Sequence, residues 1–182
     1  ITDGQIYLSP QLFDLGVLPA VDVGRSVSRV GGKAQRAPFR SVTGHLKLSY
    51  AQFVEMETFA RFGARLDKET EHSLEHGRRI RACLKQLESS PLDVADQMIV
   101  LISLTGGLFD AVPLEGMDDA QRAVLAAAAG LSGQVRKDLE FADGLRSEDR
   151  EAVLKIARAA LVQFTSITAT ATSAATKDKA AT

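Results

Sequence analysis

The stretch "SYAQFVEMETFARF", residues 49–62, carries the pattern that decides the fold of this chain. Its apolar side chains recur at spacings of three and four residues, at Phe53, Met56, Phe59 and Ala60. Because an α-helix has about 3.6 residues per turn, this spacing predicts a helix with one apolar side. Such a helix needs other elements to cover that side, so the stretch favours a packed helical assembly.

Four further segments show the helical pattern: 68–86, 93–109, 118–141 and a last helix that starts at Ser147. Their apolar positions are Leu74, Ile80, Cys83 and Leu84; Met98, Leu101, Ile102 and Phe109; Val124, Leu125, Ala128, Leu131, Val135 and Leu139; and Val153, Ile156, Ala157, Ala160, Leu161 and Phe164. Asp93 and Ser147 carry side-chain oxygens that suit a helix cap. Because the connections are short, the sequence predicts a mainly α fold, an antiparallel helical bundle over 33–166.

The two ends of the chain differ from this bundle in composition. Residues 1–32 hold two short β-leaning runs, "QIYL" (5–8) and "AVDV" (20–23), with a predicted helical turn between them that ends at Gly16. Such short runs cannot close a sheet of their own, so we expect this part to be the edge of a further domain. Residues 167–182 are rich in Ala and Thr, which predicts a disordered or weakly helical tail.

Composition and charge exclude several classes of protein. The 182 residues have a net charge of −1, so no overall positive field favours nucleic acid or an anionic membrane. The single cysteine, Cys83, excludes an internal disulfide and fits a reducing cytosol. No apolar run reaches the length of a membrane span and no signal peptide is present, so direct membrane insertion is not expected. The chain begins with Ile1 instead of Met, from which we expect it to be cut from a longer protein.

The segment "GRSVSRVGGKAQ", residues 24–35, has the Gly-Gly-Lys sequence of a possible phosphate-binding loop. The P-loop pattern requires glycine five residues before the Gly-Lys pair and a hydroxyl residue after it. Val27 and Ala34 occupy these positions, and neither the open turn nor the metal-binding hydroxyl is available from them. The segment is therefore not a P-loop.

A second motif, "HSLEH", matches the H-x-x-E-H pattern of one class of zinc proteases. His72, Glu75 and His76 share one helical face, but a catalytic zinc requires a third protein ligand, and the neighbouring charges are typical of a solvated helix face. We therefore expect no metal site. Cys83 occupies an apolar position, so it is interpreted as a buried structural thiol and not as a nucleophile.

Basic side chains stand in two places. The segment "EHGRRIRACLK" is either a basic patch for phosphates or a helix surface with many ion pairs, and its composition favours the second interpretation. Its cations are Arg78, Arg79, Arg81 and Lys85. Arg25 and Arg29 lie in a loop of small residues, where an arginine can either stay on the surface or extend into a neighbouring molecule.

Four segments carry a family resemblance: "ITDGQIYL", "PAVDVGRSVSRVGGKAQ", "FARFGARLD" and "HGRRIRACLKQ". In order and spacing they resemble the C-terminal part of the α subunit of F-type ATP synthases, and the resemblance extends to about Phe164. The double glycine of "RSVSRVGGKAQR" is similar to the alternate F-type operon of some bacteria. The resemblance implies that 1–32 is the edge of the nucleotide-binding domain and 33–166 the C-terminal helical bundle.

In that family, three α and three β subunits alternate around a central γ subunit, and catalysis occurs on β. The resemblance assigns Arg29 as the arginine finger that reaches the catalytic site of β, and Ser26 as the serine of the same loop that activity requires. It also implies bound ATP or ADP with Mg²⁺ in the full-length α subunit, and a peripheral position on the cytoplasmic face of the bacterial inner membrane. Alone, this chain lacks the P-loop, so it is predicted to be inactive. A free-standing helical interaction module without a rotary role is the alternative.

Further family positions match only in part. Phe13 and Gln86 match residues beside the adenine of the non-catalytic nucleotide, whereas Leu18 and Glu88 replace an arginine and a glutamine of that site. "FGARLD", residues 62–67, matches the family loop that faces γ, with Arg65 in place of the usual acid. These departures predict altered nucleotide binding and an altered charge toward γ.

Overall fold

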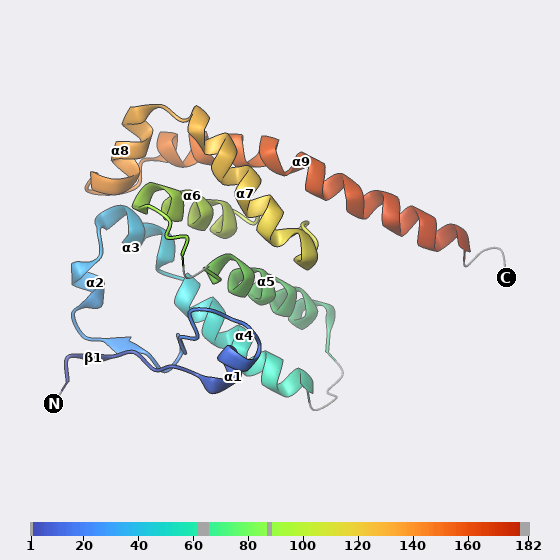
Figure 1. Cartoon of the computed structure of the whole chain (residues 1–182), viewed down its shortest axis with the longest axis horizontal. Coiled ribbons are helices and arrows are strands. Elements are labelled where there is room, and N and C mark those ends of the chain that lie inside the picture. The colour runs from blue at the N-terminus through green and yellow to red at the C-terminus, as the bar shows by residue number, and fades with distance from the viewer. Residues whose placement is uncertain (1, 62–65, 87–88, 179–182) are drawn as a thin grey trace.

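The computed structural model describes residues 2–61, 66–86 and 89–178, and it confirms a mainly helical fold (Figure 1). The bundle is built from α3 (Ala37–Thr43), α4 (Leu46–Arg61), α5 (Lys68–Leu84), α6 (Val94–Thr105), α7 (Met117–Ala127), α8 (Gly133–Phe141) and α9 (Ser147–Asp178), with the short helix α2 (Gly31–Ala34) before it. Two 3₁₀ turns, η1 (Leu114–Gly116) and η2 (Ala128–Gly130), flank α7. None of the helices in these parts of the chain is both long and apolar enough to cross a membrane.

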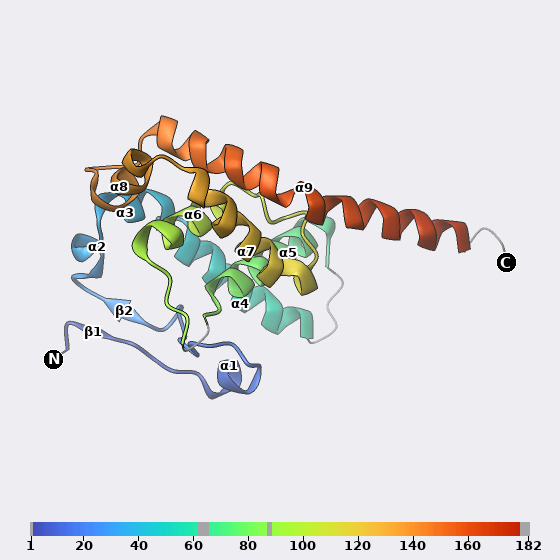
Figure 2. The same cartoon turned by 45° about the horizontal axis from the view of Figure 1, so that its top comes forward.

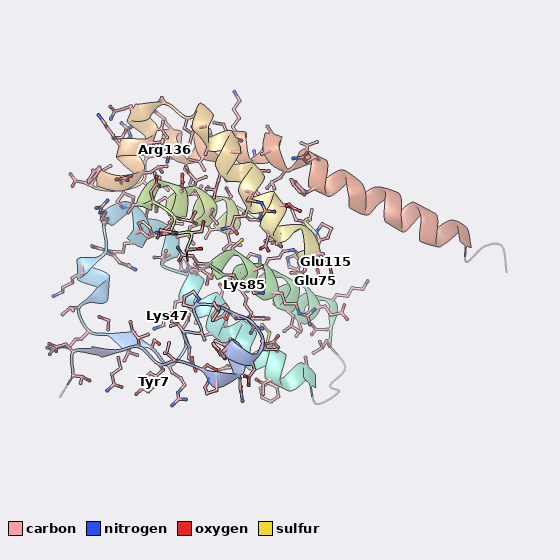
Figure 3. All side chains as sticks on the ribbon, in the orientation of Figure 1. Tyr7, Lys47, Glu75, Lys85, Glu115 and Arg136 are labelled. Atoms are coloured by element: carbon pink, nitrogen blue, oxygen red, sulfur yellow. The ribbon has the colours of Figure 1, made fainter. Side chains whose placement is uncertain are left out.

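Helix α6 is the centre of the hydrophobic core. It contacts α3, α5, α7, α8 and α9, and its residues from Met98 to Leu104 are all buried. As predicted, Asp93 caps its start, because the Asp93 carboxylate accepts a hydrogen bond from the Asp96 amide at 2.7 Å. Arg136 of α8, labelled in Figure 3, donates to Asp93 at 3.1 Å and to Asp96 at 2.8 Å, which fixes α8 beside this helix start.

Helices α4 and α5 pack closely against each other. Phe53 of α4 is fully buried, and Gly77 of α5 leaves the space that the Phe53 ring occupies. On the same contact, Arg81 donates to both carboxylate oxygens of Glu57, at 2.7 and 3.0 Å, and its guanidinium lies 4.6 Å from the Phe53 ring centroid. Phe59 does not belong to this face. It is 69% exposed, because at about 100° per residue it lies about 120° around the helix from Phe53.

Two predicted helix boundaries are wrong. The single helix expected over 118–141 is divided, because α7 passes into η2 and the chain leaves the helical conformation at Leu131. The Ser132 hydroxyl then accepts a hydrogen bond from the Val135 amide at 3.2 Å and starts α8. The helix over 93–109 ends at Thr105, and Phe109 is buried from the turn that follows. The predicted start of the last helix is correct, because Ser147 is the first residue of α9.

The last helix is longer than composition indicated. Helix α9 continues to Asp178 and extends beyond the other helices of the bundle (Figure 1). Residues 167–178 of the predicted disordered or weakly helical tail are thus helical in this structure, and how stable this part of the helix is stays a prediction. Alanine is the strongest helix former, so an Ala-rich segment can continue a helix that the bundle has already started.

The N-terminal segment packs on the side of the bundle formed by α4 (Figure 2). Strands β1 (Gly4–Gln5) and β2 (Val27–Ser28) pair antiparallel, and an isolated bridge joins Leu8 to Val21, so only part of each predicted β run pairs. Between them, α1 (Pro10–Asp14) is capped by Ser9 and followed by Gly16, whose φ of 66° favours glycine. The Gln86 amide donates to the Leu18 carbonyl at 2.9 Å, which attaches this segment to the end of α5.

Candidate functional site

Ser26 lies at the centre of the loop that precedes Arg29. Its hydroxyl donates to the Asp22 carbonyl at 2.6 Å and accepts a hydrogen bond from the Tyr7 amide at 3.0 Å. Its own carbonyl accepts a hydrogen bond from the Lys47 ammonium of α4 at 2.8 Å. Figure 3 labels Tyr7, in the segment that follows β1, and Lys47, in α4 of the helical bundle. Three separate parts of the chain therefore hold Ser26 in place.

Arg29 is one of several exposed residues of this loop. Its amide donates to the Asp3 carbonyl at 2.9 Å, and its guanidinium forms an ion pair with the Asp3 carboxylate. The Arg29 side chain is nevertheless 78% exposed, so most of the guanidinium edge is accessible to another molecule. Arg25, four residues earlier, stacks instead over the ring of Tyr7, with 5.0 Å to the ring centroid. The two loop arginines are both exposed and differ in their contacts: Arg25 stacks on the Tyr7 ring, and Arg29 pairs with an exposed carboxylate.

Phe13 and Gln86 come from opposite sides of the contact between the N-terminal segment and α5. Phe13, in α1, is 64% exposed, and Gln86 follows α5 and is bonded through its amide to Leu18. An exposed aromatic face and a free carboxamide are suitable for stacking on a purine base and for hydrogen bonding to its edge. Leu18 stands where the family pattern has an arginine, and it brings no positive charge to this site. Glu88 and Arg65, the other two departures from the family pattern, lie outside the described residues.

Comparison with known proteins agrees with this architecture. The family model described as "ATP synthase alpha/beta chain, C terminal domain" matches residues 35–160. The chain belongs to this family. It is 65% identical over 164 residues to ATP synthase subunit alpha 2 of Albidiferax ferrireducens, which covers 90% of this chain and 31% of the relative. It is 61% identical to subunit alpha 2 of Polaromonas naphthalenivorans, covering 90% of this chain and 32% of the relative.

A third relative, ATP synthase subunit alpha 1 of Marinomonas sp., is 59% identical over 168 residues, which are 92% of this chain and 33% of the relative. The chain therefore spans about a third of the length of these ATP synthase α subunits. Arg29, Ser26 and Phe13 precede the part that the family model matches, whereas Gln86 lies inside it. These comparisons establish homology to the C-terminal part of ATP synthase α subunits.

Within this ATP synthase domain, the H-x-x-E-H motif lies on α5, and its second histidine contacts a carboxylate of the turn after α6. His72 and Glu75 are exposed on α5, and the Nδ1 atom of His76 lies 2.8 Å from the Asp110 carboxylate in the turn after α6. Among the described residues, no three His, Cys, Asp or Glu side chains come together in a way that would hold a metal ion. Cys83 is buried as predicted, and burial raises the pKa of its thiol to about 12.

Two of the basic residues of α5, Arg79 and Arg81, form ion pairs, and neither is on the exposed surface. Arg79 is buried, and its guanidinium donates to the Val112 carbonyl at 3.2 Å and pairs with Glu75 at 3.5 Å. Arg81 is half-buried against Glu57. The interpretation of a surface rich in ion pairs is therefore correct for the pairing of Arg79 and Arg81, and wrong about the position of Arg79, which is buried.

Sequence reasoning missed two residues that shape the Arg29 loop, Lys47 and Asp3. Both contacts join positions about 20 or more residues apart, with separations of 21 for Lys47 and Ser26 and 26 for Asp3 and Arg29. Neither residue belongs to a motif with a fixed spacing to the loop. The one available signal was the "ITDGQ" segment, which the family resemblance quoted without a role for its aspartate.

Proposed function

We propose that this chain is the C-terminal part of the α subunit of an F-type ATP synthase, and that Arg29 acts in trans on the catalytic site of a neighbouring β subunit. The observation that carries the proposal is the contrast between a fixed loop and a mostly exposed guanidinium, whose partner on this chain is the exposed Asp3 carboxylate. Ser26 is held by Tyr7, Asp22 and Lys47, and three residues later Arg29 is 78% exposed. A loop of this kind can deliver a charge to a neighbour in a reproducible position.

The chemistry of arginine suits this task. Phosphoryl transfer spreads negative charge over the oxygens of the transferred group, and a planar, permanently charged guanidinium can bind two of those oxygens together. The surface ion pair with Asp3 does not prevent this, because an exposed pair of this type is worth only about 0–1 kcal/mol. Ser26 then has a positioning role, since its hydroxyl is already committed to the backbone of its own loop.

The remaining partners and cofactors follow from the same proposal. Three copies of the full α subunit alternate with three β subunits, and the helical domain helps to form the collar around γ. In the full-length subunit, Phe13 and Gln86 border the adenine of a non-catalytic ATP or ADP with Mg²⁺, whose phosphates are bound elsewhere. The complex couples ion flow to ATP synthesis or hydrolysis as a peripheral assembly on the cytoplasmic face of the bacterial inner membrane. No nucleic acid takes part.

The exposed apolar side chains of residues 1–32 favour this proposal over a free-standing interaction module. Ile6, Leu8 and Phe13 are all exposed, and a cluster of large apolar side chains on one segment is typical of a surface that another domain covers. In the α subunit, the rest of the nucleotide-binding domain provides that cover. A free-standing module offers no reason for these residues.

A transition-state analogue tests the role of Arg29 directly. In a reconstituted complex whose α subunit carries this segment, MgADP with fluoroaluminate mimics the transferring phosphoryl group. We expect Arg29→Ala to abolish trapping of the analogue on β while MgADP alone still binds, because the guanidinium acts mainly in the transition state. Trapping of the analogue by Arg29→Ala at the wild-type level would refute the proposal.

A further inference from the structure

A cavity of about 310 Å³ lies between the N-terminal segment and the helical bundle. It is bounded by Leu15 and Val17 of the loop after α1, by Leu114 of η1, and by residues of α4 and of the last turns of α5. Its volume is within the range of about 300–1,000 Å³ that is typical of small-molecule sites. Phe13 and Gln86, the candidate adenine contacts, are not part of its lining.

The charges that line this cavity do not cancel. Glu57 and Arg81 both face it, but they form a two-bonded pair with each other and leave no net charge. Arg78 and Lys85 also line it, and neither side chain has a hydrogen-bond or ion-pair partner within the described parts of the chain. Arg78 lies in α5 and Lys85 directly follows the last residue of this helix, so the two cations border the same end of α5. Figure 3 labels Lys85 at the end of α5 that borders the N-terminal segment.

The apolar wall of the cavity is formed by residues of the loop after α1 and of η1. Leu15, Val17 and Leu114 supply side chains without hydrogen-bonding groups, and the small side chain of Ala82 also lines the cavity. A ligand that matches both walls needs a negative group of one or two charges and a compact apolar body. Inorganic phosphate would leave the apolar wall uncovered, and an uncharged apolar molecule would leave both cations without a partner.

We propose that this cavity binds a small amphipathic anion, in which a phosphate or carboxylate group is attached to a short alkyl or aryl body. The negative group lies between Arg78 and Lys85, and the apolar body lies against Leu15, Val17 and Leu114. Such a ligand contacts the N-terminal segment and the bundle at once, so its binding joins the two parts more firmly. This site does not depend on the role proposed for Arg29.

Titration of the full 182-residue chain with hexyl phosphate, followed by amide NMR, tests this site. We expect saturable binding at one site, with shifts concentrated in residues 15–17, 78–85 and 114. Inorganic phosphate and hexanol, which each offer half of the ligand, should bind at least tenfold more weakly than hexyl phosphate. Equal binding of inorganic phosphate, or shifts outside these residues, would overturn the proposal.

Two variants with the same change in charge separate a specific site from general attraction. Arg78→Gln with Lys85→Gln should weaken hexyl phosphate binding at least tenfold. Lys155→Gln with Arg158→Gln removes the same two charges from exposed positions of α9 and should change binding less than twofold. A third variant, Ala82→Leu, fills the cavity without a change in charge and should also weaken binding. Circular dichroism verifies that each variant is folded, and wild-type affinity in the Arg78 and Lys85 double variant would contradict the site.

Discussion

Cys83 illustrates at the scale of one residue how burial sets the chemistry of a side chain in this bundle. The thiol lies in the core, and burial raises its pKa from 9.0 to about 12, because a thiolate loses its hydration there. At neutral pH the thiol is therefore protonated and inaccessible. We expect Ellman's reagent to label the native chain far more slowly than the chain unfolded in guanidinium chloride. Equal labelling rates in the two states would contradict the burial.

The same shift in the pKa of Cys83 predicts how stability depends on pH. The folded pKa lies above the unfolded value, so the unfolded state loses its proton first as the pH rises. The contribution of the thiol is complete below about pH 9 and is lost between about pH 9 and pH 12. Replacement by alanine should remove this part of the alkaline loss, as measured by denaturant unfolding at pH 7 and pH 10. The same pH dependence in both proteins would rule out this effect of Cys83.

At the scale of elements, the contact between α4 and α5 depends on Gly77. A Cβ atom added at Gly77 would lie 2.1 Å from Cγ and 2.4 Å from Cβ of Phe53, so the buried ring would have to move. Alanine gains about 1 kcal/mol in helix propensity over glycine, but overpacking of a core costs about 1–3 kcal/mol. Because the clash reaches the backbone-proximal atoms of Phe53, we expect Gly77→Ala to destabilise the chain by about 1–3 kcal/mol.

Gly133 provides the matched control for this substitution. It lies in the first turn of α8, and an added Cβ atom would have no atom within 4 Å. Gly133→Ala should leave the free energy of unfolding unchanged or raise it by up to about 1 kcal/mol. Urea unfolding of both variants distinguishes a packing effect from a general effect of glycine. A Gly77→Ala chain as stable as Gly133→Ala would show that the contact tolerates the extra carbon.

The elements also show how far the sequence could predict this fold. Periodic apolar positions gave the existence of the bundle helices and most of the core, because burial follows the 3.6-residue repeat. They did not predict that the helix expected over 118–141 is divided into α7 and α8 at η2 and Ser132. The apolar positions continue from Val124 to Leu139 across this break, so they do not mark it. The contacts of the Arg29 loop were missed for another reason. Asp3 and Lys47 meet the loop only through the tertiary fold, and no local pattern marks such partners.

At the scale of the whole molecule, the N-terminal segment and the bundle differ in how much apolar surface they bury. Among the described residues of 1–32, Val17 and Ala20 are the buried apolar ones, whereas α6 is buried along almost all of its length. Local opening costs least where little apolar surface is buried. We therefore expect amide hydrogens to exchange faster in residues 1–32 than in α6, as measured by hydrogen exchange on a verified monomer. Slower exchange in 1–32 would contradict this, and the domain boundary near residue 32 stays a prediction until then.

The central claim is that Arg29 acts across a subunit interface, and the rate of ATP hydrolysis tests it most directly. In the assembled complex, Arg29→Ala should slow hydrolysis by about 10³–10⁵-fold, the range for an arginine finger in trans. Arg29→Lys should recover little, because lysine lacks the planar fork. Arg25→Ala should cost far less, since Arg25 stacks on Tyr7 of its own chain. A loss of less than about tenfold for Arg29→Ala, or an equal loss for Arg25→Ala, would contradict the account.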